Sequence, residues 1–399
     1  MPPDSTLLKG DALEVLKTLA ASSVQTIITS PPYFHLRNYG VAGQIGLEET
    51  PDLYVEKLVE IFREARRVLR DDGTLWVNMG DSYAGSGGAY HASTKNRGIS
   101  NSANRSGFTE LGKSSLYQTP AGFKPKDKYG IPWRVALALQ ADGWYLRQDI
   151  IWSKPDPLPE AVLDRPSTSH EYIFLFSKSE NYFYDYLAVL EPVTGNAHNR
   201  GAGKNPKLQE YVDHEAGRSR ANTDFQEKTH LPSAALERNR RSVWTISTAP
   251  YRGAHFATYP EELVEICILA GTSARGACPS CDAPWRRIVE KHTPGKSYLP
   301  HQKDELLQGK SRTSVIPKEY RKPTTLGWEP SCEHHYHALP PVPCVVLDPF
   351  VGSGTTVAVA LRLGRSGIGI DLKDQYLDLA RKRIQAETVP FPGLEKDCK

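Results

Sequence analysis

The 399-residue chain lacks any long run of apolar residues, and it has only six cysteines. No stretch approaches the roughly 18 consecutive apolar residues that predict a membrane-spanning helix. The first residues, MPPDSTLLKG, do not show the charged-then-apolar profile of a secretory signal. Six cysteines without such a signal argue against a disulfide framework and make metal binding worth testing. A cytoplasmic protein without a membrane anchor is therefore expected.

Net charge is also low, since the formal value is only +3, but basic residues are concentrated in two polar segments. Residues 85–130 hold seven Lys or Arg against two Asp or Glu, and residues 196–253 hold ten against six. The rest of the chain is therefore net acidic. Two basic segments on an acidic body indicate a polyanionic partner, although solvated loops would show the same composition.

Strand and helix signals alternate at both ends of the chain, and no internal repeat is visible. Residues 52–70 show the apolar spacing of a helix with one buried face, and GTLWVNMG (73–80) predicts a buried strand. Further helices are expected at 132–141, 260–270, 355–364 and 374–387, and further strands at 146–154, 171–178, 344–348 and 367–371. The alternation predicts an α/β fold, with a parallel sheet covered by helices and assembled from the two ends of the chain.

Three segments interrupt this alternation. Residues 85–128 are rich in Gly, Ser, Asn and Lys without periodicity, which predicts a long mobile loop. Residues 156–250 hold one strand signal and then a polar, basic stretch, which suggests an appended module. Residues 276–340 carry cysteines and histidines and form an expected insertion. The core would then comprise residues 1–155 together with residues 251–275 and 341–399.

The stretch VVLDPFVGSGTTVAVALRLGRSGIGIDL has a strand ending at Asp348, a tight turn with Gly352 and Gly354, and then a helix. Asp371 closes the next strand about 20 residues on, where nucleotide-binding folds place a carboxylate that accepts ribose hydroxyls. No Lys follows the glycines, which excludes a P-loop, and the spacing departs from the dinucleotide pattern G-x-G-x-x-G. A carboxylate at the start of the turn suits a ligand with a cationic group, so S-adenosylmethionine (AdoMet) is the natural candidate.

Two motifs together resemble a known enzyme family. LDPFVGSGTT resembles the AdoMet-binding motif of the DNA amino-methyltransferases, and TSPPY (29–33) resembles their catalytic motif. The catalytic motif comes first along the chain, an order similar to that of the permuted β group of these enzymes, which methylate cytosine N4 or adenine N6 and accompany restriction endonucleases. The resemblance implies a Rossmann-like AdoMet-dependent methyltransferase sheet with circularly permuted motifs. Residues 1–155 would be its catalytic half, and residues 251–275 with 341–399 its AdoMet-binding half.

The resemblance also implies which residues bind the cofactor. GDALEVLKTL resembles the segment that reaches the adenine edge, and HFATYPEELVEICILAG resembles the loop and helix that hold the methionine end. The cofactor-binding residues implied are Asp11, Phe256, Thr258, Asp348, Phe350, Gly352, Gly354, Thr355, Thr356 and Asp371.

The chemistry explains the residue types in TSPPY. An exocyclic amine is a poor nucleophile because its lone pair is delocalised into the base. The Ser30 hydroxyl and the Pro31 carbonyl could each accept one N–H, which favours a pyramidal nitrogen whose lone pair points at the sulfonium methyl. Pro31 and Pro32 fix φ, and Tyr33 would stack on the base after it is flipped out of the duplex. Methyl transfer is then a direct displacement without a covalent enzyme intermediate.

The identity of Ser30 favours one base over the other. In the resembling family, Ser at this position is found more often with N4-cytosine methylation, and Asp or Asn with N6-adenine methylation. Both amines present two N–H donors, so N6-adenine methylation remains the alternative. Cytosine C5 methylation needs a cysteine nucleophile after the cofactor motif, whereas the one Pro-Cys pair, Pro343-Cys344, precedes it. More distant alternatives are an RNA or protein amine methyltransferase and an inactive, zinc-stabilised DNA-binding protein.

Duplex DNA is the expected partner, and residues 156–250 are the expected target-recognition region. Basic side chains there and near the catalytic motif could contact phosphates or guanine edges. These candidates are Arg37, Lys154, Arg238, Arg240, Arg241 and Arg252. A cognate restriction endonuclease would act separately, and the chain would be a monomer or a homodimer.

The insertion at 276–340 predicts a metal site. CPSCDAPW has two cysteines in C-x-x-C spacing, and WEPSCEHHYH adds one cysteine and three histidines about 50 residues later. Four such ligands suit a structural Zn²⁺ ion in a small zinc-ribbon-like insertion, and reduced cysteines without a metal are the alternative. The favoured ligands are Cys278, Cys281, Cys332 and His334, with His335 and His337 as alternatives to the last.

Overall fold

The computed structural model describes residues 2–85, 119–157, 159–192, 237–248, 259–290, 324–336 and 340–388. Contacts divide the chain into a larger unit, built from residues 1–185, 241–286 and 328–399, and a smaller one, built from 186–240 and 287–327. The described elements, in chain order, are β1 (Ser5–Lys9), α1 (Ala12–Thr18), β2 (Val24–Thr29), α2 (Pro51–Val68), β3 (Leu69–Met79), α4 (Ile131–Ala141), β4 (Tyr145–Ser153), β5 (His170–Ser177), η3 (Tyr186–Val189), β6 (Glu191–Pro192), β7 (Glu237–Arg238), β8 (Val243–Thr245), α6 (Glu261–Gly271), β9 (Trp285–Val289), β10 (Thr325–Pro330), η7 (Glu333–Tyr336), β11 (Val345–Asp348), α7 (Thr355–Arg362), β12 (Ser366–Asp371) and α8 (Asp374–Thr388).

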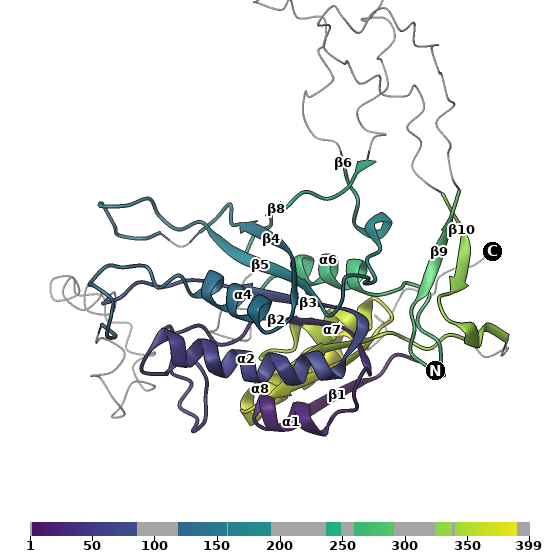
Figure 1. The fold of residues 1–399 in the computed structure, drawn as a ribbon, viewed down its shortest axis with the longest axis horizontal. Coiled ribbons are helices and arrows are strands. Elements are labelled where there is room, and N and C mark those ends of the chain that lie inside the picture. Colours follow the sequence, from purple (N-terminus) through teal and green to yellow (C-terminus); the bar gives the residue numbers. More distant parts are fainter. Residues whose placement is uncertain are drawn as a thin grey trace, which may run out of the picture. The chain divides into compact units, whose positions relative to one another are not determined.

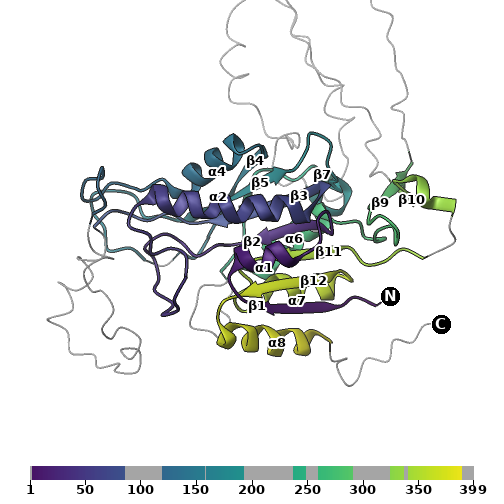
Figure 2. The same ribbon diagram turned by 60° about the horizontal axis from the view of Figure 1, so that its bottom comes forward.

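One eight-stranded sheet organises the larger unit, with the order β1-β12-β11-β2-β3-β5-β4-β8; Figure 1 labels β8, and Figure 2 labels the other seven strands. β11, near the C-terminus, pairs in parallel with β2, and β1 pairs in parallel with β12. The predicted α/β fold, with a central sheet assembled from the two ends of the chain, is therefore confirmed. Smaller two-stranded sheets pair β9 with β10 and β6 with β7.

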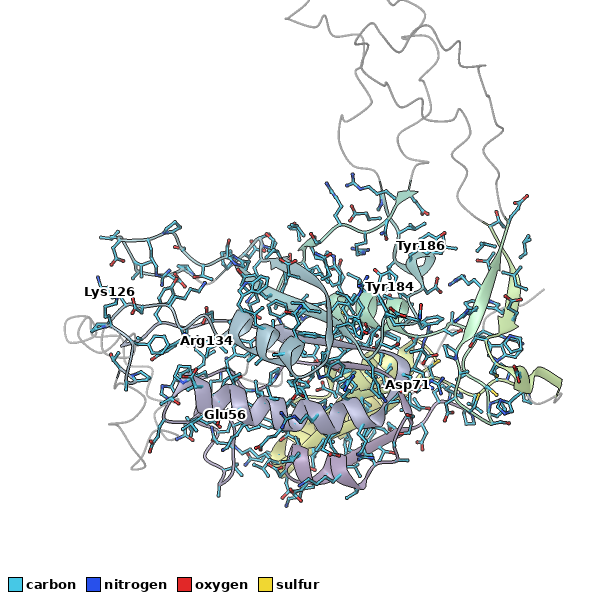
Figure 3. The ribbon with its side chains drawn as sticks, viewed as in Figure 1. Glu56, Asp71, Lys126, Arg134, Tyr184 and Tyr186 are labelled. Atoms are coloured by element: carbon cyan, nitrogen blue, oxygen red, sulfur yellow. The ribbon has the colours of Figure 1, made fainter. Side chains whose placement is uncertain are left out.

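The helices form two layers around the sheet. One buried core joins α1, α2 and α4 to β2, β3 and β5, and a second core is built by α7 and α8 (Figures 1 and 2). α2 and α4 lie side by side, and Figure 3 labels Glu56 on α2 and Arg134 on α4. Arg134 Nη1 lies 3.3 Å from the carboxylate of Asp52, at the start of α2. No helix in the described part of the chain combines the length and apolarity needed to cross a membrane.

The sheet corrects two expectations. It is mixed rather than wholly parallel, because β5 runs antiparallel to both of its neighbours, β3 and β4. The expected core boundary at residue 155 is also too early, since β5 and β8 lie in the segment 156–250 yet pair within the central sheet. The physical reason is the connection: no helix among the described residues separates β4 from β5, and adjacent strands joined without a crossover helix run antiparallel. Residues 173–177 are buried, so β5 must lie in the interior of the sheet rather than at its edge.

Candidate active site

A cavity of about 920 Å³ lies at the carboxyl ends of the parallel strands. Ser30 directly follows β2, Gly80 follows β3, Pro349 follows β11 and Asp371 ends β12, and all four line the cavity. Open α/β sheets bind their ligands at this edge. The topology therefore brings the catalytic motif and the glycine loop, which are far apart along the chain, to one cavity.

Most of the residues predicted for the site line this cavity. Both halves of the sheet and two of the basic candidates for DNA contact contribute. The lining residues among the predicted ones are Asp11, Ser30, Pro31, Pro32, Tyr33, Arg37, Lys154, Phe350, Gly352, Thr355 and Asp371.

The other predicted residues are not among the described residues that line the cavity. Asp348, Gly354 and Thr356 are not among the lining residues. Phe256, Thr258 and Arg252 lie outside the described residues, as does most of the expected loop at 85–128.

Two of the basic residues expected to bind DNA, Arg238 and Arg240, have partners within the protein. In the smaller unit, Arg238 pairs with Glu191 at 2.8 Å, and Arg240 Nε donates to the Val189 carbonyl at 3.1 Å. Arg241 belongs to the larger unit and does not line the cavity. The Arg238 guanidinium therefore has a protein partner that a phosphate would have to replace.

Asp348 differs from its predicted role as a direct cofactor contact. Its side chain is fully buried, and Oδ1 accepts from Thr29 Oγ1 (2.7 Å) and the Phe350 amide (3.0 Å). Oδ2 accepts from Thr356 Oγ1 (2.6 Å) and the Tyr259 hydroxyl (2.8 Å). Burial raises the pKa of this carboxyl, and the hydrogen bonds oppose that shift. A buried carboxylate needs such partners, so Asp348 ties β2, β11 and α7 together beneath the glycine loop instead of facing the cavity.

Asp371 faces the cavity. Its Oδ2 accepts from the Gly352 amide at 3.0 Å and its Oδ1 from the Lys373 amide at 2.8 Å. Burial raises the pKa of Asp371, and the two backbone amides oppose the rise. Asp11, also on the cavity wall, caps α1 by accepting from the Leu13 amide at 2.9 Å. Two carboxylates held by backbone amides are therefore available to hydrogen-bond donors of a ligand.

The catalytic corner, residues 30–33, is held from several sides. The Tyr54 hydroxyl donates to the Pro32 carbonyl at 2.8 Å, and Gly80 leaves room for the Tyr33 ring, since a Cβ there would lie 2.7 Å from Tyr33 Cε2. The Ser30 hydroxyl donates to the Tyr33 hydroxyl at 3.3 Å. These contacts hold Ser30 and Tyr33 on one wall of the cavity.

Two cavity residues, Asn78 and Glu171, belong to no motif that the sequence revealed. Asn78 Nδ2 donates to Glu171 Oε2 at 3.1 Å, and the Tyr33 hydroxyl donates to the same oxygen at 2.7 Å. The available signal was a polar residue within or beside a buried apolar strand, in WVNM and in HEYIFLF. Buried polar groups of this kind need partners, and here they supply partners to the catalytic corner.

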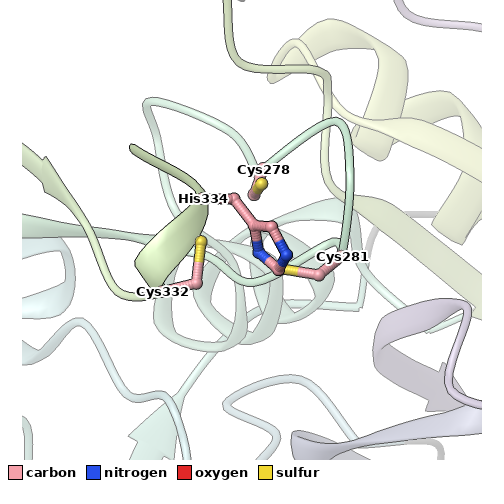
Figure 4. A group of neighbouring side chains, drawn as sticks. All are labelled: Cys278, Cys281, Cys332 and His334. Atoms are coloured by element: carbon pink, nitrogen blue, oxygen red, sulfur yellow. The ribbon is translucent and has the colours of Figure 1, made fainter. Parts of the chain in front are cut away.

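The four predicted metal ligands come together. The ligand atoms of Cys278, Cys281, Cys332 and His334 all lie within 4.8 Å of one another (Figure 4). His337 and the side chain of His335 lie outside the described residues. The structure thus brings together the four side chains that the sequence predicted as one ligand set.

The cluster is fastened to the end of the sheet opposite the cavity. The Cys281 carbonyl accepts a hydrogen bond from Arg70 Nη1, and the Asp282 carbonyl accepts one from Gln25 Nε2 at 2.9 Å. Gln25 and Arg70 lie at the amino ends of β2 and β3, whereas the cavity lies at the carboxyl ends. The cluster is thus placed to stabilise the fold rather than to take part in the chemistry of the cavity.

Gly354 begins α7 with a left-handed backbone, at φ +83°. A Cβ at this position would lie 2.8 Å from Ala380 Cα. We expect Gly354→Ala to destabilise the protein, since a left-handed alanine costs roughly 1–2 kcal/mol and overpacking adds roughly 1–3 kcal/mol. Thermal unfolding would measure the loss, at roughly 1–2 °C per kcal/mol for a chain of 399 residues.

Gly364→Ala is the matched control for this substitution. Gly364 has a similar φ of +77°, but no atom of the described residues would lie within 4 Å of a Cβ added there. It should show the backbone cost alone. Equal destabilisation by the two variants would contradict the contact between Gly354 and α8.

The mixed sheet, the glycine loop with its carboxylates and the Ser-Pro-Pro-Tyr corner at one cavity define an AdoMet-dependent methyltransferase. A family model described as DNA methylase matches residues 24–278 and 344–382. The chain belongs to this family of N6/N4 DNA methylases, which confirms the resemblance seen in the motifs. The match breaks between residues 278 and 344, the segment that holds most of the cysteine cluster.

Similar proteins agree with this family. The Type II methyltransferase M.Cfr9I of Citrobacter freundii is 37% identical over 383 residues, covering 96% of this chain and 88% of its own. The Type II methyltransferase M.SmaI of Serratia marcescens is 36% identical over 381 residues, covering 95% and 90%. Among solved structures, the PvuII DNA methyltransferase (cytosine-N4-specific) matches with a TM-score of 0.49 at 16% identity, covering 100% of this chain and 91% of that chain. The family match and the Type II relatives make the chain a DNA methyltransferase of the kind found in restriction-modification systems.

Proposed function

We propose that this DNA methyltransferase transfers a methyl group from AdoMet to the exocyclic N4 amine of a cytosine flipped out of duplex DNA. The observation that carries the proposal is that Ser30 lines the same cavity as Gly352 and Asp371. The Ser30 hydroxyl can accept an amine N–H, and the Asp371 carboxylate can accept ribose hydroxyls. One cavity could therefore hold both the target amine and the methyl donor.

The cavity fits AdoMet by its chemistry. Asp371 would accept the ribose hydroxyls, Asp11 would lie toward the adenine edge, and Phe350 offers an apolar contact. Gly352 allows the backbone to approach a ligand closely, and its amide is held by Asp371. When bound, AdoMet supplies an electrophilic methyl group on a sulfonium.

The catalytic corner would hold the target amine. Ser30 Oγ and the Pro31 carbonyl would each accept one N–H, and the Tyr33 ring, which lines the cavity, would stack on the base. Tyr33 cannot swing freely because its hydroxyl is bonded to Glu171 at 2.7 Å. Arg37, also on the cavity wall, would meet the phosphate of the flipped nucleotide, whereas Lys154 is paired with Glu171.

Target recognition would fall to segments outside the central sheet. Because β5 and β8 belong to the central sheet, the proposed recognition region comprises the segment between β4 and β5 and residues 186–240. We also propose that the motif order is circularly permuted and that a cognate restriction endonuclease acts as a separate protein.

Product analysis tests the base. The protein would be incubated with labelled AdoMet and varied duplex DNA, and the DNA would be digested to nucleosides for mass spectrometry. N4-methylcytosine would support the proposal, because serine at position 30 favours methylation of the cytosine amine. N6-methyladenine would establish the alternative base, and absence of label in DNA would refute DNA methylation by this chain.

We further propose that Cys278, Cys281, Cys332 and His334 hold a structural Zn²⁺ ion, since three thiolates and one imidazole are a typical zinc ligand set. Metal analysis should find close to one zinc per chain. Cys281→Ser should lose that zinc and lower the melting temperature by about 2 °C or more, since about 2 kcal/mol suffices for such a shift in a chain of 399 residues.

Cys344→Ser is the control for zinc content. Cys344 is buried next to the Ser273 carbonyl and is not part of the cluster, so this variant should keep its zinc. AdoMet affinity should survive in Cys281→Ser at low temperature, because the cluster lies at the opposite end of the sheet from the cavity. A zinc content near zero in protein purified without chelators would contradict the site.

A further inference from the structure

A half-buried carboxylate meets the catalytic corner from β5. The Glu171 side chain is 17% exposed and lines the cavity. Its Oε2 accepts from the Tyr33 hydroxyl at 2.7 Å and from Asn78 Nδ2 at 3.1 Å. Its Oε1 accepts from Lys154 Nζ, beside the end of the neighbouring strand β4. Three different segments around the catalytic corner thus direct donors at this one carboxylate.

The hydrogen bonds run in one direction, away from Ser30. Ser30 Oγ donates to the Tyr33 hydroxyl at 3.3 Å, and the Tyr33 hydroxyl donates to Glu171 at 2.7 Å. Asn78 Oδ1 also lies 3.1 Å from the Tyr33 hydroxyl, but the closer, charged oxygen of Glu171 is the stronger acceptor. The lone pairs of Ser30 Oγ are therefore directed to accept a hydrogen bond from a ligand.

We propose that this chain of donors removes the proton that the target amine must lose, from Ser30 through Tyr33 to Glu171. The inference rests on the proposed amine methylation. It assigns Glu171 the role of terminal proton acceptor, acting through two other residues.

The step balances in atoms and charge. The amine nitrogen forms a bond to the methyl carbon, and the electron pair of the broken methyl–sulfur bond stays on sulfur. The nitrogen then carries one proton too many, so one N–H bond breaks and its proton moves to Ser30 Oγ. The Ser30 proton passes to Tyr33, and the Tyr33 proton passes to Glu171 Oε2. Neutral Glu171 returns the proton to water through the cavity.

Tyr33 is suited to pass a proton without becoming charged. Burial and the adjacent negative charge of Glu171 raise the pKa of the Tyr33 hydroxyl well above its usual value. The phenol therefore stays neutral and exchanges one O–H bond for another. The Lys154 ammonium balances the charge of Glu171 before the proton arrives.

Single-turnover kinetics test the relay. Glu171→Gln keeps an oxygen acceptor for Tyr33 but cannot take the proton, and Tyr33→Phe keeps the ring but breaks the chain. Each should slow methyl transfer about 100-fold, the lower range for proton transfer by a positioned side chain. The double variant should be no slower than either single variant, because the residues act as a unit.

Glu64→Gln is the matched control. Glu64 is also a part-buried carboxylate paired with a basic side chain, Arg67, at 2.7 Å, but it does not line the cavity, and no bond joins it to the catalytic corner within the described part of the chain. Its rate should stay within about threefold of wild type, since a surface ion pair contributes little. AdoMet affinity, and the fluorescence of 2-aminopurine placed beside the target cytosine, should be unchanged in Glu171→Gln if the base still enters the cavity.

The pH profile separates proton transfer from positioning. The acidic limb of the pH–rate profile should therefore differ between wild type and Glu171→Gln, because only the carboxylate can take up the proton. Tyr33 and Lys154 are the titratable groups bonded to the carboxylate, and His170 and Asp81 line the same cavity. A rate within about threefold of wild type, an unchanged acidic limb, or loss of the 2-aminopurine signal in Glu171→Gln would overturn the relay. Absence of methyl transfer by the wild-type protein would instead overturn the proposed function.

Discussion

Replacing Ser30 with alanine is expected to slow methyl transfer about 100-fold in a single turnover, a loss of roughly 2.7 kcal/mol of transition-state stabilisation. The Ser30 hydroxyl would accept an amine N–H and so orient the lone pair of the nitrogen at the methyl donor. Removing one positioned hydrogen-bonding group from a developing charge typically costs about 100-fold or more in rate. AdoMet should bind with near wild-type affinity, because the carboxylates that would hold it, Asp11 and Asp371, have no bond to Ser30 among those of the described residues.

Rapid-quench measurement of labelled DNA gives the rate, and calorimetry gives the AdoMet affinity. Ser82→Ala is the matched control, since Ser82 Oγ donates to the Phe34 carbonyl at 3.1 Å beside the catalytic corner but does not line the cavity. That variant should stay within about threefold of the wild-type rate, because it loses one neutral hydrogen bond. Weak AdoMet binding by Ser30→Ala, in step with its loss of rate, would contradict the role assigned to the hydroxyl.

Replacing Asp371 with alanine should weaken AdoMet binding about 100-fold. A hydrogen bond to a charged group contributes about 1.5–3 kcal/mol, and the ribose hydroxyls would lose their acceptor. The glycine loop would also lose the bond from the Gly352 amide to Asp371, which is 3.0 Å long. The loss should appear in the dissociation constant measured by calorimetry, while the maximal single-turnover rate at saturating AdoMet should change much less.

Asp374→Ala is the control for this variant. Asp374 lies three residues further on, and its exposed carboxylate pairs with Lys9 at the surface. Removing it leaves the cavity intact and should change AdoMet affinity less than about twofold, as expected for an exposed ion pair. An Asp371→Ala protein that binds AdoMet as well as the control would show that Asp371 is not the ribose carboxylate.

Local sequence patterns predicted the elements well because each depends on nearby residues. The helices at α2 and α7 and the strands at β3 and β12 follow from apolar spacing and from the residues that cap or end them. The placement of β5 does not follow from its own residues. Its direction depends on the connection from β4, which has no helix among the described residues, and its neighbours depend on what covers residues 173–177. A strand signal says nothing about the partner strand.

The site shows the same contrast between features that local sequence predicts and features that depend on distant residues. The motifs predicted the composition of the cavity wall, but the orientation of Asp348 depends on Thr29, which is 319 residues away in the chain. Asn78 and Glu171 carried a weak signal, as polar residues in buried strands, and their meaning appears only when β3 and β5 are paired. The members of the Cys/His cluster were predicted because C-x-x-C spacing is local and few other cysteines and histidines lie in the insertion.

The pairing of β11 with β2 and of β12 with β1 has a consequence for folding during synthesis. β1 and β2 are made first, yet their partners β11 and β12 lie in the last part of the sequence. The catalytic corner is therefore translated long before the strands and the glycine loop that complete its cavity. During synthesis β1 and β2 remain without these partners until β11 and β12 have been made, so the cavity is complete only after β12.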